Sequence, residues 1–420
     1  MKEKMNVKEY NSLIVATGLG SMLGSGIIVA LAVTITVWQA GLGFSDSQVG
    51  ILSGTLTFAI AAGSLMAGNI TKKFGLFRPF DYMNILYAVG ALICMFTSNF
   101  TMLFVGLIMT GFASGADVPI SLTVLSHDAP DEKTSARLIA IVQVFWQIGA
   151  AVGTVLGFAV SRMEGLLGAR IIFCNLCVIA AVGVVTRIFS KKVKELHRAG
   201  EEYRKADGET VSKEISFRQL FSGIDKKKYL GFFLCITIYY CCWNLICNTL
   251  GQFQTYILVK ADASQFIATG IGLLLTVVGL LSGVAYTRVA GSSSRNLWFY
   301  IGSVLQLAAM LGMAIGGNSI AIMVLMLACY TVANPFAGET TYKVWTQESF
   351  PMEARASVQG FINGFSRFCC GVVALIAPML VTAERIQGTM FASAGIIVIS
   401  ILAGVWMIRL QKQYGVGQME

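Results

Sequence analysis

The sequence predicts an all-α membrane protein with twelve transmembrane helices in two six-helix halves. Of its 420 residues, 55% are hydrophobic and only 13% are charged, and the mean hydropathy is +0.71. An average soluble domain is about one quarter charged, so the composition argues against a water-soluble enzyme. A bilayer crossing needs about 20 apolar residues, and a chain of this length therefore accommodates twelve crossings joined by short loops.

Apolar segments of crossing length account for most of the chain. The first follows a basic stretch and is longer than the about 7 to 15 residues of a signal-peptide core, so it is expected to remain as a spanning helix. In order, the twelve segments cover approximately 11–39, 47–69, 80–98, 101–126, 138–161, 167–189, 229–257, 264–287, 296–316, 318–346, 355–381 and 387–409.

One long polar segment separates the sixth apolar segment from the seventh, and its mixed charge predicts a solvated linker. The predicted organisation is an N-terminal six-helix half at 1–189, a cytoplasmic linker at 190–228 and a C-terminal six-helix half at 229–420. The ends of segments four and ten also repeat one another, as GADVPISLTVLSHDAPDEKTSAR and GETTYKVWTQESFPMEAR. Parallel repeats of this kind are typical of carriers that bind substrate between their halves near the membrane midplane.

Lys and Arg residues gather on one side of the predicted membrane. Cytoplasmic loops carry the excess of these residues, which places both termini in the cytoplasm together with the linker, in which Arg187 is counted. Two cations, Lys343 and Arg367, remain inside spans. The opposite side contains Arg162, Arg170, Lys260 and Arg385.

Composition and motifs exclude several other classes of protein. The net charge of +9 is spread between apolar segments rather than gathered on one solvated face, so no nucleic-acid partner is expected. The ten cysteines lie in apolar runs, and Cys174 and Cys177 have no second pair, so neither disulfides nor a metal site is expected. The HExxH and GxSxG motifs are absent. We therefore predict no enzymatic activity and no cofactor.

Several stretches resemble the major facilitator superfamily, and within it the sugar-porter and metabolite:proton symporter branch. Gly68 to Gly75 is similar to the family's loop after helix two, except that Lys72 occupies the position of an acid, and the second-half copy retains Arg288. Glu348 to Arg355 is similar to the sugar-porter motif that closes helix ten. The resemblance covers essentially the whole chain. It implies a gating role for Lys72, Lys73, Arg288, Glu348 and Arg355.

The resemblance also assigns residues to the substrate. A Trp-Gln pair in segment five resembles the stretch in which a glutamine of the porters binds a sugar hydroxyl, and an arginine in segment eleven occupies the position of an aromatic substrate contact. Three amides of segment seven are spaced four residues apart and share one helix face; hydrogen bonding between helices is their alternative role. The predicted substrate residues are Trp146 and Gln147 of segment five, Trp243, Asn244, Asn248 and Gln252 of segment seven, and Arg367.

The proton-coupling pair of the sugar symporters is not reproduced. Gly26 stands in place of their helix-one acid, and Leu107 in place of the helix-four arginine that pairs with it. The stretch Gly115-Ala-Asp117-Val-Pro119 instead resembles the GxDxP motif of phosphate and organic-acid symporters. In those proteins the aspartate takes part in proton and substrate handling, and the resemblance transfers that role to Asp117.

Three ionisable residues fall near the middle of the predicted membrane. Counted at about 1.5 Å per residue from the nearest helix end, Asp117, Glu339 and Arg367 lie roughly 14 to 18 Å deep, where such groups mark a pathway or a partner. Glu339 precedes Lys343 by four residues, the favourable order for an intrahelical pair, so it is either a structural carboxylate or a second coupling acid. Asp117 has no base one turn away and is expected to titrate more freely. Arg367 needs an anion, either a protein carboxylate or an acidic group of the substrate.

Together these features predict a secondary transporter of a small hydroxylated metabolite (a sugar, polyol or sugar acid) that works by alternating access with proton symport through Asp117 or Glu339. A uniporter or exporter of the same substrates and a transport-inactive nutrient sensor are the alternatives. The expected partners are the small-molecule substrate, a proton and the lipid bilayer. We expect a monomer in the cell (inner) membrane.

Overall fold

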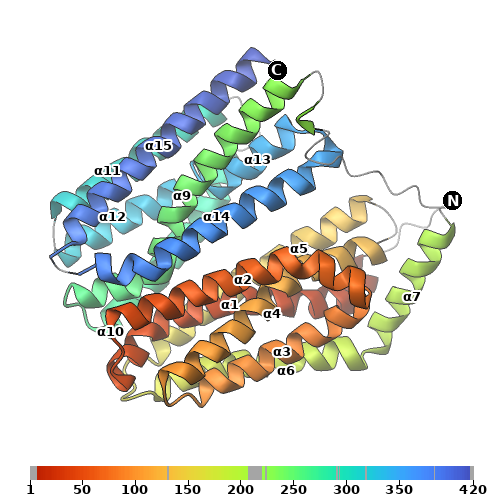
Figure 1. Cartoon of the computed structure of the whole chain (residues 1–420), viewed down its shortest axis with the longest axis horizontal. Coiled ribbons are helices and arrows are strands. Elements are labelled where there is room, and N and C mark those ends of the chain that lie inside the picture. Colours follow the sequence, from red (N-terminus) through yellow and green to blue (C-terminus); the bar gives the residue numbers. More distant parts are fainter. Residues whose placement is uncertain are drawn as a thin grey trace. The chain divides into compact units, whose positions relative to one another are not determined.

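The computed structural model describes residues 7–129, 132–206, 220–222, 225–289, 292, 294–316, 319–382 and 384–416, and every regular element in these ranges is a helix (Figure 1). The chain divides into two compact units, Met1–Thr210 and Val211–Glu420. The boundary between the units falls inside the predicted linker, of which residues 207–219 lie outside the described residues.

The N-terminal unit contains the first six predicted spans and one further helix. Polar residues in the short loops fix where two of the spans begin, because Ser45 Oγ accepts a hydrogen bond from the Gln48 N–H (3.3 Å) and Asn99 Oδ1 accepts one from the Met102 N–H (3.0 Å). After a 3-10 turn at Val7–Tyr10, the helices are α1 (Asn11–Leu42), α2 (Asp46–Phe74), α3 (Phe77–Met95), α4 (Phe100–Asp128), α5 (Glu132–Ala159), α6 (Leu167–Phe189) and α7 (Lys191–Ala206).

The C-terminal unit contains the remaining predicted spans, one of them in two pieces. The sequence predicted a single helix at 318–346, but this segment breaks at 334–338, where Pro335 and Gly338 interrupt the helix. The helices are α9 (Lys226–Lys260), α10 (Gln265–Thr287), α11 (Arg295–Gly316), α12 (Ile320–Ala333), α13 (Glu339–Ser349), α14 (Met352–Leu380) and α15 (Ile386–Gln413).

The same relative pairs of helices pack together in both units. In the N-terminal unit, α1 packs against α5 and α6, while α3 packs against α4 and α6. In the C-terminal unit, the helices in the corresponding positions do the same: α9 packs against α14 and α15, and α11 packs against α12 and α15. The packing therefore repeats as the sequence repeats.

The beginning of the predicted linker is folded onto the N-terminal unit. Asp128, the last residue of α4, lies with its Oδ1 2.8 Å from Nδ1 of His127 and with its Oδ2 2.5 Å from Nδ1 of His197 on α7. This part of the linker is thus a helix that contacts α4 and keeps most of its described residues exposed. Arg187, which the sequence analysis counted with the linker, belongs to the last turn of α6, and its side chain is buried.

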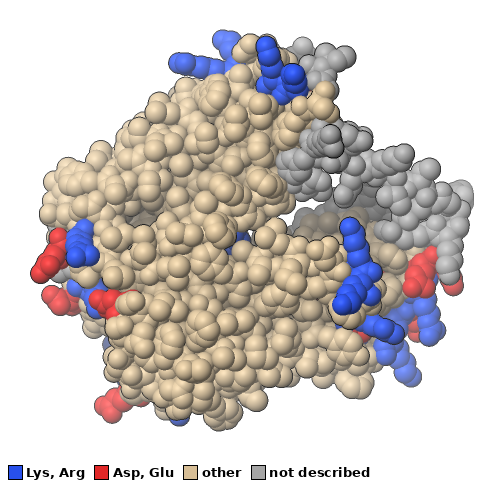
Figure 2. All heavy atoms as spheres, viewed as in Figure 1, with Lys and Arg blue, Asp and Glu red and all other residues tan. Residues whose placement is uncertain are grey.

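The outer surface of the helices is that of a multi-pass membrane protein. Among the described helices, ten are long and apolar enough to cross a bilayer; α3, which is more polar at its start, and the shorter α12 bring each unit to six spans. Large hydrophobic side chains such as Leu65, Leu281 and Ile315 are exposed along the spans. On the face shown in Figure 2, charged side chains lie at the ends of the helices, and the surface between them carries almost none.

Candidate functional site

A buried ion pair joins α4 to α6 in the N-terminal unit. Arg187 donates from Nη1 to Asp117 Oδ1 (2.5 Å) and from Nη2 to Asp117 Oδ2 (2.9 Å). The two side chains are 0% and 3% exposed. Two parallel bonds between a guanidinium and a carboxylate are among the strongest side-chain contacts in proteins, so each charge here neutralises the other.

Other groups around this pair accept further hydrogen bonds from the guanidinium or lie against it. Arg187 Nε donates to the carbonyl oxygen of Ala16 (3.0 Å) and Nη1 to that of Phe80 (2.6 Å), while the Phe80 ring lies 4.0 Å from the guanidinium carbon. Gly20 leaves the space that the pair occupies, because a Cβ there would overlap Asp117 Oδ2 and Arg187 Nη2. As the sequence indicated, no base stands one turn away from Asp117 on its own helix; its base comes from another helix, 70 residues away in the sequence.

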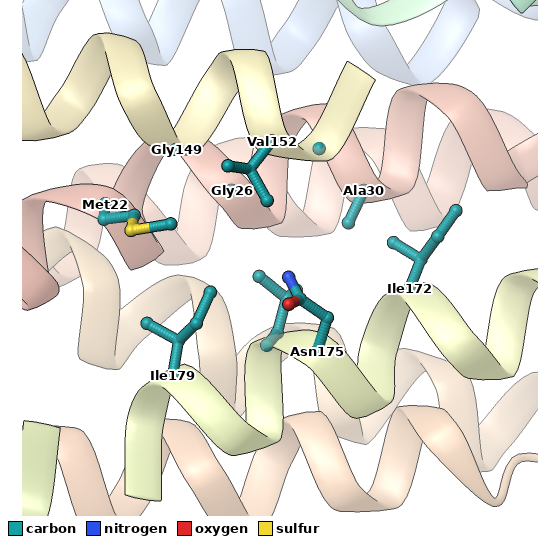
Figure 3. A pocket seen from close by; sticks show the side chains of 10 residues that line it. Met22, Gly26, Ala30, Gly149, Val152, Ile172, Asn175 and Ile179 are labelled. Atoms are coloured by element: carbon teal, nitrogen blue, oxygen red, sulfur yellow. The ribbon is translucent and has the colours of Figure 1, made fainter. Parts of the chain in front are cut away.

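Gly26, which the resemblance places at the helix-one acid of the sugar symporters, has no titratable side chain. Gly26 lines a cavity of about 10 Å³ between α1, α5 and α6, and Asn175 is the one polar side chain among its lining residues and points into it (Figure 3). A space of this size holds about one water molecule. Proton coupling at this place therefore has no carboxylate to use.

Trp146 and Gln147 lie on α5 beside α1. Ser25 Oγ donates to the Trp146 carbonyl oxygen (2.6 Å), and the Trp146 ring lies against Gly24. The Trp146 side chain is half-buried in this contact, whereas Gln147 is exposed. The amide of Gln147 therefore lies outside the α1–α5 interface.

The break between α12 and α13 is held by aromatic residues of α9. Trp243 Nε1 donates to Asn334 Oδ1 (2.9 Å), and the Tyr239 hydroxyl donates to the Gly338 carbonyl oxygen (3.2 Å). Gly338 allows this approach, since a Cβ there would lie 2.9 Å from the Trp243 ring. Helices interrupted in this way place backbone polar groups at substrate sites in transporters.

Next to the break, α9, α13 and α14 together present aromatic rings and amides. Tyr240 stacks on Tyr342 of α13, with ring centroids 4.0 Å apart, and on Trp243, with centroids 5.6 Å apart. Asn244 Nδ2 donates to Ser366 Oγ on α14 (2.8 Å), which is one of the interhelical bonds that the sequence left as an alternative.

Farther along α9, the predicted common face is present for two of the amides. Gln252 Nε2 donates to Asn248 Oδ1 (2.7 Å), one turn away on the same helix. The Gln252 side chain is buried, and Asn248 is half-buried.

Three charges lie around the break in the C-terminal unit. Glu339, the first residue of α13, binds Lys343 with 2.9 Å between Oε1 and Nζ, and the two side chains are 49% and 47% exposed. The predicted intrahelical pair is therefore present. Arg367 on α14 is half-buried. Its charge and that of Glu339 both act on the Tyr240 hydroxyl.

The residues assigned to gating lie near the ends of the helices. Lys72, Lys73 and Arg288 are exposed. Glu348 Oε1 and Oε2 accept hydrogen bonds from Arg295 Nη1 (2.6 Å) and Nη2 (2.9 Å), and Gln411 Nε2 donates to the same carboxylate (3.2 Å). Arg355 Nε instead donates to the Phe350 carbonyl oxygen (2.9 Å). Glu348 thus ties α13 to α11 and α15.

Sequence reasoning missed several residues of these clusters. Arg187 was visible as a lone cation in the apolar run of α6, but its position near the predicted end of the span assigned it to the linker. Pro335 and Gly338 were the local signal for the broken helix. Asn334 and Ser366 had no such signal, because their partners are on other helices.

Comparisons with known proteins agree with this architecture. The model of the major facilitator superfamily matches residues 13–374. The chain is 28% identical to the minor myo-inositol transporter IolF of Bacillus subtilis, over 94% of this chain and 90% of that protein. It is 23% identical to the glucose transporter GlcP of Staphylococcus epidermidis, over 87% and 85%. The crystal structure of a D-xylose-proton symporter has the same fold, with a TM-score of 0.76 at 15% identity over 94% of this chain and 96% of that one.

Proposed function

This chain belongs to the major facilitator superfamily, and from that premise we propose that it is a proton-coupled secondary transporter of a small hydroxylated metabolite. It is a transporter of this family and not an enzyme. The proposed substrates are a sugar, a polyol or a sugar acid, moved by alternating access between the two halves. Relatives named as transporters of myo-inositol and glucose support this substrate class.

The observation that carries the proposal is the broken helix α12–α13 with the side chains around it. An interrupted span brings backbone polar groups into the membrane, and here side chains donate hydrogen bonds to the carbonyl oxygens of the break. The rings of Tyr240, Trp243 and Tyr342 stand beside it. Apolar rings combined with a few fixed polar groups are the usual lining of small-molecule sites. We assign the substrate to this region of the C-terminal unit, with Asn244, Asn248, Gln252 and Arg367 as further contacts.

Trp146 and Gln147 are the proposed contacts from the N-terminal unit. The exposure of Gln147 supports this assignment, as does the similarity of its stretch to the sugar porters. The gating role proposed for Lys72, Lys73, Arg288, Glu348 and Arg355 is supported by their positions near helix ends.

Glu339 is the carboxylate that we propose for proton coupling. Protonation of Asp117 would leave Arg187, which keeps its charge at any accessible pH, buried without a counter-charge, and that is strongly unfavourable. Glu339 and Lys343 are each about half exposed, so protonation of Glu339 does not leave Lys343 enclosed as Arg187 would be. We therefore propose a structural role for Asp117 in place of the coupling role that the resemblance implied.

The proposed setting is the inner membrane, with both termini in the cytoplasm and the chain acting as a monomer. A uniporter or exporter of the same substrates would share the site but not the coupling. A transport-inactive sensor would bind substrate without moving it. Exchange of labelled substrate by the purified protein in liposomes separates these possibilities.

The coupling assignment is tested with Glu339→Gln in proteoliposomes. The variant should keep counterflow of labelled substrate but lose accumulation driven by an imposed pH gradient, because its amide cannot exchange a proton. Glu384→Gln, which removes an exposed carboxylate outside the spans, is the matched control and should accumulate substrate normally. Accumulation by Glu339→Gln would show that another group carries the proton.

A further inference from the structure

The charges near the break of α12–α13 do not balance. Glu339 contributes one negative charge, whereas Lys343 and Arg367 each contribute a positive one, so this cluster of the C-terminal unit carries one positive charge in excess. Glu339 is bound to Lys343, and in the other unit Asp117 is bound to Arg187. Over the described residues, no carboxylate lies within ion-pair distance of Arg367.

An arginine inside a membrane span requires an anion, because it does not lose its proton. Both intramembrane carboxylates that the sequence offered as partners are occupied by other bases. We propose that Arg367 binds an oxyanion of the substrate, so that the transported metabolite is a sugar acid, such as a uronate or an aldonate, rather than a neutral sugar or polyol. This inference rests on the proposed transport function and specifies its substrate class.

The surroundings of Arg367 suit such a ligand. Its neighbour on α14, Ser366, accepts the hydrogen bond from Asn244, so the backbone of Arg367 lies next to the amide-bearing part of α9. The Tyr240 hydroxyl is within electrostatic reach of both Arg367 and Glu339, and its ring is part of the aromatic stack. A carboxylate at Arg367 would therefore leave the hydroxylated part of the ligand next to rings and amides.

The geometry of the guanidinium favours a carboxylate over a neutral group. Its fork matches the two oxygens of a carboxylate with parallel hydrogen bonds. The same fork has no comparable match on a hydroxyl, which accepts at one oxygen. An acid should therefore bind more tightly than a neutral analogue of the same shape, and Arg367 should account for that difference.

The test compares D-glucuronate with D-glucuronamide, which keeps the ring hydroxyls but carries no charge. Ligand-induced thermal shifts of the purified protein give apparent affinities. The unchanged protein should bind the acid about tenfold or more tightly than the amide, since a hydrogen bond to a charged group contributes that much. Arg367→Gln should remove this preference and leave amide binding within about twofold, while Arg367→Lys should restore it only in part.

Arg385→Gln is the matched control, because it removes one positive charge from an exposed position outside the spans. It should bind the acid like the unchanged protein. If Arg367→Gln does not fold, the comparison of acid with amide on the unchanged protein still decides the substrate charge.

Two results overturn the inference: equal affinities for acid and amide, or a loss in Arg367→Gln that is the same for both. The substrate class then returns to neutral sugars and polyols. Benzoate, a carboxylate without hydroxyls, separates this failure from that of the proposed function. If benzoate binds through Arg367 as tightly as glucuronate, the oxyanion site stands and the hydroxylated substrate class fails.

Discussion

The two units of this protein differ in the burial and pairing of the charges inside their spans. In the N-terminal unit, Asp117 and Arg187 are buried and bind each other through two hydrogen bonds. In the C-terminal unit, Glu339 and Lys343 are half exposed, and Arg367 has no ion pair within the described residues. The closed pair ties α4 to α6, whereas the half-exposed, unbalanced cluster has an arginine without an ion-pair partner among the described residues.

The difference follows from burial. A buried ion pair has no solvent to replace a lost partner, so either charge alone is strongly unfavourable. A half-exposed pair is not enclosed in this way, so the loss of one partner is less unfavourable. We therefore propose that the same residue types serve structure in one unit and transport in the other.

Removal of Arg187 should have the largest effect on stability. Arg187→Met leaves Asp117 buried without its counter-charge and should lower the free energy of unfolding by about 3 to 5 kcal/mol, measured by thermal or denaturant unfolding in detergent. The double variant Asp117→Asn with Arg187→Met should recover most of this loss, because no isolated charge remains. Equal stability of Arg187→Met and the unchanged protein would contradict a closed, structural pair.

A methyl group at Gly20 should have the next largest effect. Gly20→Ala would place a Cβ against Asp117 Oδ2 and Arg187 Nη2 and should destabilise by about 1 to 3 kcal/mol through overpacking. Gly395→Ala, in the middle of α15 where no atom lies within 4 Å of the new methyl, is the control and should be neutral or slightly stabilising. If both variants unfold at the same temperature, Gly20 is not needed to accommodate the pair.

In the C-terminal unit, loss of an interhelical hydrogen bond should have a small effect. Ser366→Ala removes the acceptor of the Asn244 amide and should lower stability by about 0.6 kcal/mol, the average for such bonds in membranes. Unfolding in the same detergent measures it. A loss of stability several times larger would mean that Asn244 chiefly holds α9 and α14 together. Its proposed contact with substrate would then be wrong.

The smallest effect on stability is expected at Arg367. Arg367→Gln removes a cation that has no ion pair in the described part of the chain, so the free energy of unfolding should change by no more than about 0.5 kcal/mol. Its unfolding temperature is measured beside that of Arg187→Met. A loss as large as that of Arg187→Met would show that Arg367 also belongs to a structural pair, and the contrast between the units would disappear.

The order of the spans could be predicted from sequence because hydropathy is a local property. The stretch 11–39 was expected as the first span, and α1 covers Asn11–Leu42. The pair of Glu339 with Lys343 was likewise predictable, since four residues on one helix fix the distance. The pairing of Asp117 was not, because Arg187 reaches it only when α4 and α6 are both packed against α1 and α3.

The sequence by itself determined that this is a membrane protein of repeated halves, which charges lie within the spans, and the family that it resembles. These are properties of composition, length and residue order. Only the tertiary structure decided which of those charges are neutralised, where the tenth span breaks, and that Gly20 makes room for an ion pair. The physical reason is that ion pairs and close contacts depend on distances between helices, and these distances are set by packing rather than by separation along the chain.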